Sequence, residues 1–248
     1  MFETEAQIVT RNGTMPTFIA RPDGDGPFPP VIVYMDAPGI REELRNIARR
    51  IAGQGYYCLL PDMYYRLGTV RFNLAQRDER MSAVIGACLR HLDNDRVNDD
   101  TAGMLSFLDA DPRADAARVS CVGYCMSGRY TIAAAAKFGA RFASAVSLYG
   151  VGLMTEDEGS PHKLVANVPG ELYFGFAETD TAAPPATIEG IRQALRAGGP
   201  KHEVEVFSNT KHGYCFVTGP AYEPIAAEAT WRKLFALWDR TLKGKRAG

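Results

Sequence analysis

A strand, a tight turn and a helix are encoded in residues 119–130, and this stretch constrains the fold more than any other part of the chain. Residues 119–122 form a short apolar run that is typical of a buried parallel strand. Residues 130–136 include four consecutive alanines and favour a helix. The turn between them has the sequence Gly123-Tyr124-Cys125-Met126-Ser127-Gly128. A turn this short strains the backbone of its central residue, so we expect the Cys125 side chain to stand clear of the sheet.

This turn has the pattern of a nucleophile elbow, with a cysteine where a serine is more usual. The strand and the helix pass close together there, which explains the small residues Gly123 and Ser127. A helix that starts at Met126 would direct its free N–H groups and its positive end at Cys125, and would favour both a thiolate and an oxyanion. A cysteine is otherwise a small buried side chain, which is our interpretation of Cys58, Cys88 and Cys121.

Apolar runs alternate with amphipathic segments along the rest of the chain, which predicts an α/β fold. Residues 6–10 and 14–20 flank Asn12-Gly13, a hairpin signal. Further strands are expected over residues 31–35, 56–62, 119–124, 142–149, 170–176 and 203–207, the last one near a sheet edge. Helices are expected over residues 41–54, 71–92, 94–108, 126–136, 187–197 and 222–242, and loops over 63–69, 154–168 and 209–214. The pattern predicts a single domain over residues 1–248, with a mostly parallel central sheet flanked by helices on both faces.

Composition excludes several classes of protein. A net charge of -1 argues against nucleic acid or an anionic membrane as a partner. We find no apolar run near the ~18 residues of a membrane span, and the acidic start lacks the apolar segment of a signal peptide. Five cysteines without CxxC spacing predict reduced thiols, a cytoplasmic location, and neither a disulfide scaffold nor a zinc site. We expect a monomer or a small homo-oligomer.

Four polar residues are expected at the carboxyl ends of strands, where parallel sheets bind their ligands. They are Asp36, Cys125, Asp180 and His212. The order of nucleophile, acid and histidine along the chain is that of a catalytic triad on this kind of sheet. We therefore expect Cys125 to be the nucleophile, His212 the base, and Asp180 the acid that orients the base.

Other interpretations compete for some of these residues. Glu178 follows the same strand as Asp180, although the shorter aspartate is the more usual partner of the imidazole. Asp36 could instead cap the helix that begins near Arg41. Arg80 could be an ordinary solvated charge on a helix.

Several motifs, in order, resemble the dienelactone hydrolase (carboxymethylenebutenolidase) family over roughly residues 31–242. The elbow is similar to the family's Gly-Tyr-Cys-x-Gly-Gly, and residues 180–184 look like its Asp-x-x-x-Pro turn. His212 and the residues after it look like the family's base loop. Residues 60–64 and 149–152 are similar to its Pro-Asp-Leu-Tyr and Tyr-Gly motifs.

The resemblance implies an α/β-hydrolase fold, a triad of Cys125, His212 and Asp180, a thioester acyl-enzyme, and no metal or cofactor. It also implies a carboxylate, usually a glutamate, that pairs with the resting thiol; Asp36 occupies that place. The oxyanion would be held by the backbone N–H groups of Met126 and Ala37.

The family binds its substrate's carboxylate with two arginines, and this chain departs from that pattern. Arg80 is the candidate for the first, but no arginine follows His212 closely. Five aromatic residues are candidates either to line the substrate pocket or simply to pack in the protein: Tyr64, Tyr65, Phe72, Tyr124 and Phe216.

The sequence therefore predicts a cysteine hydrolase of small lactones or esters, such as a dienelactone in aromatic degradation. One alternative is a general small-ester or thioester hydrolase on the same fold. Another is a redox sensor, in which Cys215 would form a disulfide with an oxidised Cys125.

Overall fold

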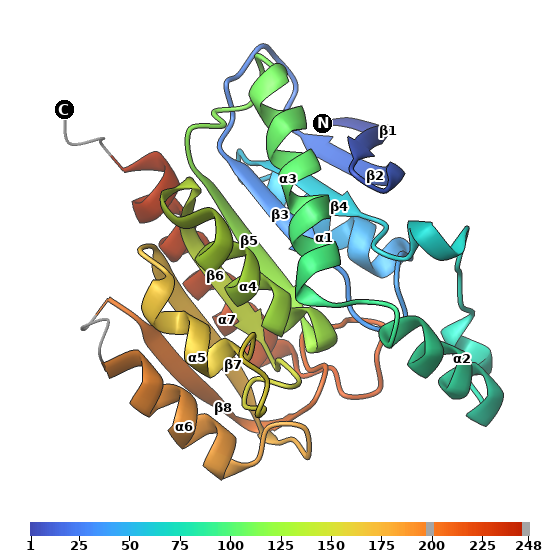
Figure 1. Ribbon diagram of the computed structural model, residues 1–248, viewed down its shortest axis with the longest axis vertical. Helices are drawn as coiled ribbons and strands as arrows, with labels where there is room; N and C mark the ends of the chain where they lie inside the picture. Colours follow the sequence, from blue (N-terminus) through green and yellow to red (C-terminus); the bar gives the residue numbers. More distant parts are fainter. Residues whose placement is uncertain (197–200, 245–248) are drawn as a thin grey trace. The chain divides into compact units, whose positions relative to one another are not determined.

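The computed structural model describes residues 1–196 and 201–244, and the chain divides into two compact units, residues 1–117 and 118–248 (Figure 1). Both units combine strands with helices, and their strand pairings are mostly parallel outside the N-terminal hairpin. The predicted α/β class is confirmed. Within the described ranges, no helix is both long and apolar enough to cross a membrane.

The first unit has four strands in the order β1-β2-β4-β3. Its elements are β1 (Phe2–Thr10), β2 (Gly13–Arg21), β3 (Pro30–Tyr34), α1 (Glu42–Ala52), β4 (Tyr57–Pro61), α2 (Glu79–Leu89) and α3 (Asn94–Ala110). The predicted hairpin is the antiparallel pair β1 and β2, whereas β3 and β4 run parallel. Helix α1 packs against β2 and β4, and α3 packs against β1.

The second unit has four parallel strands in the order β5-β6-β7-β8. Its elements are β5 (Val119–Tyr124), α4 (Gly128–Phe138), β6 (Phe142–Leu148), α5 (Pro161–Leu164), β7 (Glu171–Thr179), α6 (Pro185–Leu195), β8 (Glu203–Lys211) and α7 (Pro224–Trp238). Helices α4, α5 and α6 cover one face of these strands, and α7 covers the other (Figure 1). Because these strands are parallel, the carboxyl ends of β5, β7 and β8 lie along the same edge of the sheet. Each of the three strands is followed by a polar residue of the predicted site.

The apolar residues that the sequence pattern assigned to the core are buried in the structure. Every residue of β3, β4, β5 and β6 is buried, as expected for strands covered on both faces. The helical periodicity of residues 41–54 predicts that Leu44, Ile47, Ala48 and Ile51 share one face, and all four are buried in α1. On α3 the buried stripe also includes Asp100, whose carboxylate forms a buried ion pair with Arg66.

Some predicted boundaries were wrong. Residues 71–92 do not form one helix: Asp78 accepts a hydrogen bond from the Met81 N–H at 2.7 Å, and this N-cap starts α2 only at Glu79. Residues 154–168 are not all loop, because Pro161 opens the short helix α5.

The predicted ends of two further elements were wrong. The long C-terminal helix changes to a π-helical turn over Asp239–Lys243. Strand β8 continues through Lys211 instead of ending at residue 207. The expected end of the helix at residue 197 falls outside the described residues.

Candidate active site

The turn after β5 has the strained geometry expected of a nucleophile elbow. Cys125 follows the last residue of β5, has a φ of 54°, and is half-buried. A left-handed backbone is costly for a residue with a side chain and persists only where the surrounding structure imposes it. A 3₁₀ turn over Cys125–Ser127 comes first and the α-helix begins at Gly128, so the predicted start of the helix at Met126 was slightly early.

Close approach of the strand to the turn explains the glycine two residues before the cysteine. A Cβ atom on Gly123 would lie 2.3 Å from the carbonyl oxygen of Ser127, which is backbone and has little freedom to move. The carbonyl of Cys125 accepts a hydrogen bond from the Val151 N–H at 3.0 Å, which ties the elbow to the loop after β6. The elbow is thus fixed from two sides.

Substituting Gly123 with alanine should destabilise the protein, because the new methyl group must displace backbone. We expect a loss near the upper end of the roughly 1–3 kcal/mol that overpacking costs, measured as a lower midpoint of urea denaturation. Gly86 within α2 is the matched control, since its Cβ would meet only a side-chain nitrogen of Arg90, at 3.7 Å. Gly86→Ala should leave stability unchanged or raise it by about 0.5–1 kcal/mol. Equal midpoints for the two variants would contradict this account of the elbow.

Asp180 and His212 meet directly. Asp180 follows β7, His212 follows β8, and the His212 Nδ1–H donates to Asp180 Oδ2 at 2.7 Å. The other oxygen of this buried carboxylate accepts the Ala182 N–H at 2.9 Å. Glu178, the competing acid, instead accepts the Asn209 N–H at 2.8 Å. Of the two carboxylates considered from the sequence, it is therefore Asp180 that contacts the imidazole.

The charge state of His212 is set by three influences. Burial lowers its pKa, but hydrogen bonds to Asp180 and Cys125 and the charges of both raise it, with a net pKa of about 10. Because Nδ1–H is directed at Asp180, the other ring nitrogen, Nε2, remains for Cys125. The net effect favours the protonated imidazolium form of His212.

Removing the thiol should lower the pKa of His212 measurably. In Cys125→Ala both the hydrogen bond and the charge of the sulfur disappear, so an NMR titration should place the imidazole transition below the wild-type value of about 10. His202 is an internal control: burial holds its pKa below 6.5, and its Nδ1 accepts the Leu172 N–H. An unchanged His212 transition would show that Cys125 does not interact with the imidazole.

The raised pKa of His212 also makes the free energy of unfolding depend on pH. Since the folded pKa of His212 lies above the ordinary 6.5, its protonation stabilises the fold fully below about pH 6.5. That contribution is lost as pH rises through about 10, and the loss should be smaller in Cys125→Ala.

Tyr149 belongs to a motif recognised in the sequence, but its contact with His212 was not predicted. It lies in the Tyr-Gly motif after β6, is fully buried, and has a φ of 38°. Its ring packs edge-on against His212, with the ring centroids 5.2 Å apart. Tyr124 and Phe216, both predicted to line a pocket, are buried and pack on each other at 5.3 Å. The left-handed backbone of Tyr149 also indicates a special position, but that feature is visible only in the structure.

The remaining predicted residues lie in the first unit. Asp36 is buried two residues after β3, and both its oxygens accept hydrogen bonds from the guanidinium of Arg41. Burial raises the pKa of Asp36, although Arg41 opposes this. The alternative of Asp36 as a helix cap was wrong, because the N-cap position of α1 is Arg41.

Two further candidates of the first unit have contrasting environments. Tyr64 is fully buried, and its hydroxyl donates to the carbonyl of Ala37 at 2.8 Å, which supports the turn after β3. Arg80 is exposed at the second position of α2. This exposure fits a solvated charge on a helix.

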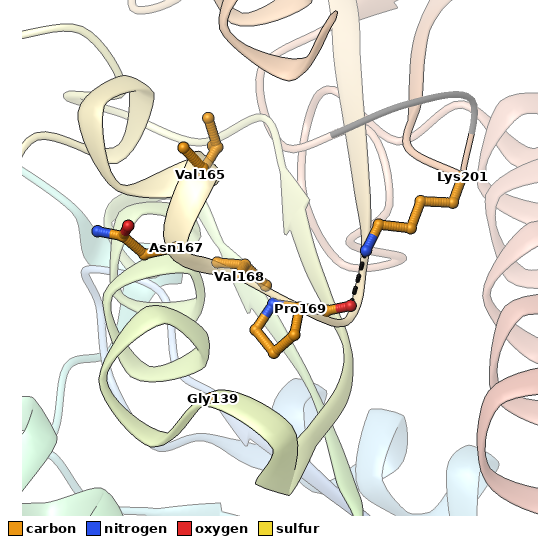
Figure 2. A pocket seen from close by; sticks show the side chains of 7 residues that line it. Gly139, Val165, Asn167, Val168, Pro169 and Lys201 are labelled. Carbon is orange, nitrogen blue, oxygen red and sulfur yellow. Dashed lines mark hydrogen bonds between the residues drawn. The ribbon is translucent and has the colours of Figure 1, made fainter. Parts of the chain in front are cut away.

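A pocket of about 410 Å³ lies at the other end of the second unit's strands (Figure 2). It is lined by residues 165–169 with Gly139 and Lys201, and the Lys201 ammonium donates to the Pro169 carbonyl at 2.7 Å. Pro169 and Lys201 precede β7 and β8, whereas Asp180 and His212 follow them. This pocket is therefore remote from the candidate site.

All five cysteines are free thiols, and Cys215 is buried. Among residues 1–196 and 201–244, no group of three or more His, Cys, Asp or Glu side chains is arranged to hold a metal ion.

The chain is similar to known proteins over most of its length. Residues 15–242 match the dienelactone hydrolase family. A "Putative carboxymethylenebutenolidase" of Escherichia coli O157:H7 is 30% identical over 97% of this chain and 87% of its own length. One of Methylorubrum extorquens is 29% identical over 93% of this chain and 78% of its own.

A solved structure shows the same fold. The crystal structure titled "Putative Dienelactone Hydrolase" from Klebsiella pneumoniae superposes with a TM-score of 0.85 at 25% identity, over 96% of this chain and 98% of that one. The predicted α/β-hydrolase fold is thereby confirmed. Since the family match extends over most of the sequence, this chain is a hydrolase that belongs to the dienelactone hydrolase family.

Proposed function

We propose that the protein hydrolyses small lactones or esters, such as a dienelactone, with Cys125 as nucleophile, His212 as base and Asp180 as the acid that orients it. One observation carries the proposal: His212 is hydrogen-bonded to Asp180 and interacts with the side chain of Cys125, which stands on a strained turn. A structural cysteine would not require a left-handed backbone, a buried carboxylate and an imidazole at the same place.

The first half-reaction forms a thioester. The Cys125 sulfur attacks the carbonyl carbon, and the backbone N–H of Met126 stabilises the oxyanion. The N–H of Ala37 is the second donor that the sequence predicts. As the oxyanion collapses, the bond between the carbonyl carbon and the ester oxygen breaks, and the leaving oxygen takes the proton from His212. In a lactone this oxygen stays attached to the acyl group.

The second half-reaction depends on the change in the charge of His212. Acylation removes the negative charge of the sulfur, and with it two of the interactions that raise the pKa of His212. The neutral imidazole can then accept a proton from water, whose oxygen attacks the thioester. Cleavage of the C–S bond releases the acid and restores the thiolate beside the imidazolium.

The alternative of a general small-ester or thioester hydrolase has its own support. Residues 213–216, directly after His212, contain no arginine, and Arg80 is exposed on α2. A substrate carboxylate would therefore have at most one of the two arginines that the family resemblance implies.

Steady-state kinetics would separate the two substrate classes. A carboxylated dienelactone and a neutral aryl ester should be compared with wild type, Cys125→Ala and Arg80→Ala. If the lactone is the substrate, turnover requires Cys125, and Arg80→Ala raises KM for the lactone but not for the neutral ester. Faster turnover of the neutral ester, with no effect of Arg80→Ala, would favour the general esterase. Absence of Cys125-dependent turnover on either compound would contradict the proposal.

A further inference from the structure

The pairing of β7 with β8 changes register just before the candidate site. Ala177 pairs with Phe207 as the regular parallel ladder predicts, but the next pair is Thr179 with Lys211. One residue of β7 therefore faces three residues of β8, so β8 carries two extra residues in a bulge. Bulges of this kind often re-aim a side chain next to an active site.

This bulge decides which residue of β8 faces Asp180. If the earlier register continued, Asp180 would lie opposite Thr210, and His212 would lie beyond the reach of its carboxylate. With the two extra residues included, His212 lies opposite Asp180, and their side chains are 2.7 Å apart. The acid–base contact therefore depends on the bulge.

Three features hold the bulge in place. The Glu178 carboxylate accepts the N–H of Asn209 at 2.8 Å, and Asn209 has a φ of 59°, a conformation that asparagine tolerates better than most residues. The hydroxyl of Thr210 accepts the Glu178 N–H at 3.1 Å. The same hydroxyl donates to the Phe207 carbonyl at 2.5 Å and closes the bulge on itself.

We infer that Glu178 and Thr210 are positioning residues for the proposed hydrolysis, because they lock the bulge that sets His212 opposite Asp180. Glu178 lies two residues before Asp180, and Thr210 lies two residues before His212. Each therefore acts on the catalytic pair through a short length of backbone. The inference rests on the proposed function for its effect on catalysis, but its effect on the geometry of His212 is independent of any substrate.

Thr210 and Glu178 lie in different environments, so the effects of substituting them can be measured independently. Thr210 is buried, so its hydroxyl has no water to replace a lost partner, whereas the Glu178 side chain is exposed and contributes little to the core. A displacement of about 1 Å at a catalytic group can cost up to 10²-fold in rate. Loss of either hydrogen bond should therefore reduce kcat by about 10- to 100-fold, with a smaller change in KM.

The test uses a disruptive and a conservative variant at each position. Thr210→Val removes the hydroxyl but keeps the shape, and Thr210→Ser keeps the hydroxyl. Glu178→Ala and Glu178→Gln both remove the charge, but only the glutamine keeps an acceptor for the Asn209 N–H. Glu203→Ala is the control, because Glu203 opens the same strand and contacts Lys233 on the surface. For each protein, kcat, KM and the NMR titration of His212 are measured.

We expect Thr210→Val and Glu178→Ala to lower kcat and to lower the pKa of His212 below about 10, since the hydrogen bond to Asp180 weakens. Thr210→Ser, Glu178→Gln and Glu203→Ala should remain within about threefold of wild type in kcat. An unchanged His212 titration in both disruptive variants would overturn the inference, whatever the change in rate. If Thr210→Val does not fold, Glu178→Ala decides alone.

Failure of the inference and failure of the proposed function give different results. If wild-type turnover does not depend on Cys125, the proposed function fails, yet the titration of His212 still reports whether Glu178 and Thr210 set its contact with Asp180. If turnover depends on Cys125 but the disruptive variants titrate like wild type, only the positioning role fails.

Discussion

Cys125→Ala should reduce kcat/KM for small esters by on the order of 10⁴- to 10⁶-fold, the range seen when a triad nucleophile is removed. No other atom at this place can form the acyl-enzyme, because the alanine methyl group is not a nucleophile. The elbow should keep its shape, since alanine is smaller than cysteine and Gly123 still makes room for the turn. Steady-state kinetics and mass spectrometry of the acylated protein would measure the two consequences together.

A second cysteine provides the control for this experiment. Cys88 is a buried thiol on α2, in the other unit of the chain, so Cys88→Ala should keep activity within a few-fold of wild type and acquire the acyl adduct normally. Turnover of Cys125→Ala at the wild-type rate, or an acyl adduct on a different residue, would assign the nucleophile elsewhere.

Asp180→Asn should lower kcat by about 10⁴-fold, as expected when the imidazole is held in the wrong tautomer. The two carboxylate oxygens each accept an N–H, from His212 and from Ala182. An amide has one oxygen and one NH₂ group, so in either orientation it places a donor against a donor. The variant must therefore lose either the hydrogen bond from the Ala182 N–H or the one from His212.

A surface aspartate supplies the comparison. Asp157 is exposed and accepts a hydrogen bond from Thr155, so Asp157→Asn should keep both kcat and the His212 titration at wild-type values. In Asp180→Asn, a kcat within tenfold of wild type would mean that Asp180 does not orient the base.

Local sequence chemistry predicted much of the fold. The continuous apolar runs of β3 to β6 and the inner stripe of α1 were predicted correctly, because burial repeats with the period of the element that carries it. The elbow was predicted because a glycine between a buried strand and a helix indicates a close approach of the two, and a Cβ atom on Gly123 would indeed clash with the backbone of Ser127. Where periodicity was weak, as in residues 71–78, the predicted helix was wrong.

The polar residues of the candidate site were only partly predictable. The sequence placed Asp180 and His212 after neighbouring strands, and the two are hydrogen-bonded; their catalytic roles, and that of Cys125, stay predictions. Between Glu178 and Asp180 the sequence favoured the shorter side chain on general grounds. It contained no sign that Arg41 would engage Asp36, or that Tyr149 would pack against His212.

The sequence by itself determined the order of strands and helices, the buried faces and the cysteine turn, since these depend on residues that are near neighbours in the chain. The tertiary structure alone decided which carboxylate meets the imidazole. That choice depends on the bulge in β8 and on hydrogen bonds between residues 31 or 32 positions apart. A shift of two residues in that pairing would leave every local pattern intact and separate Asp180 from His212, because register is a property of two strands together.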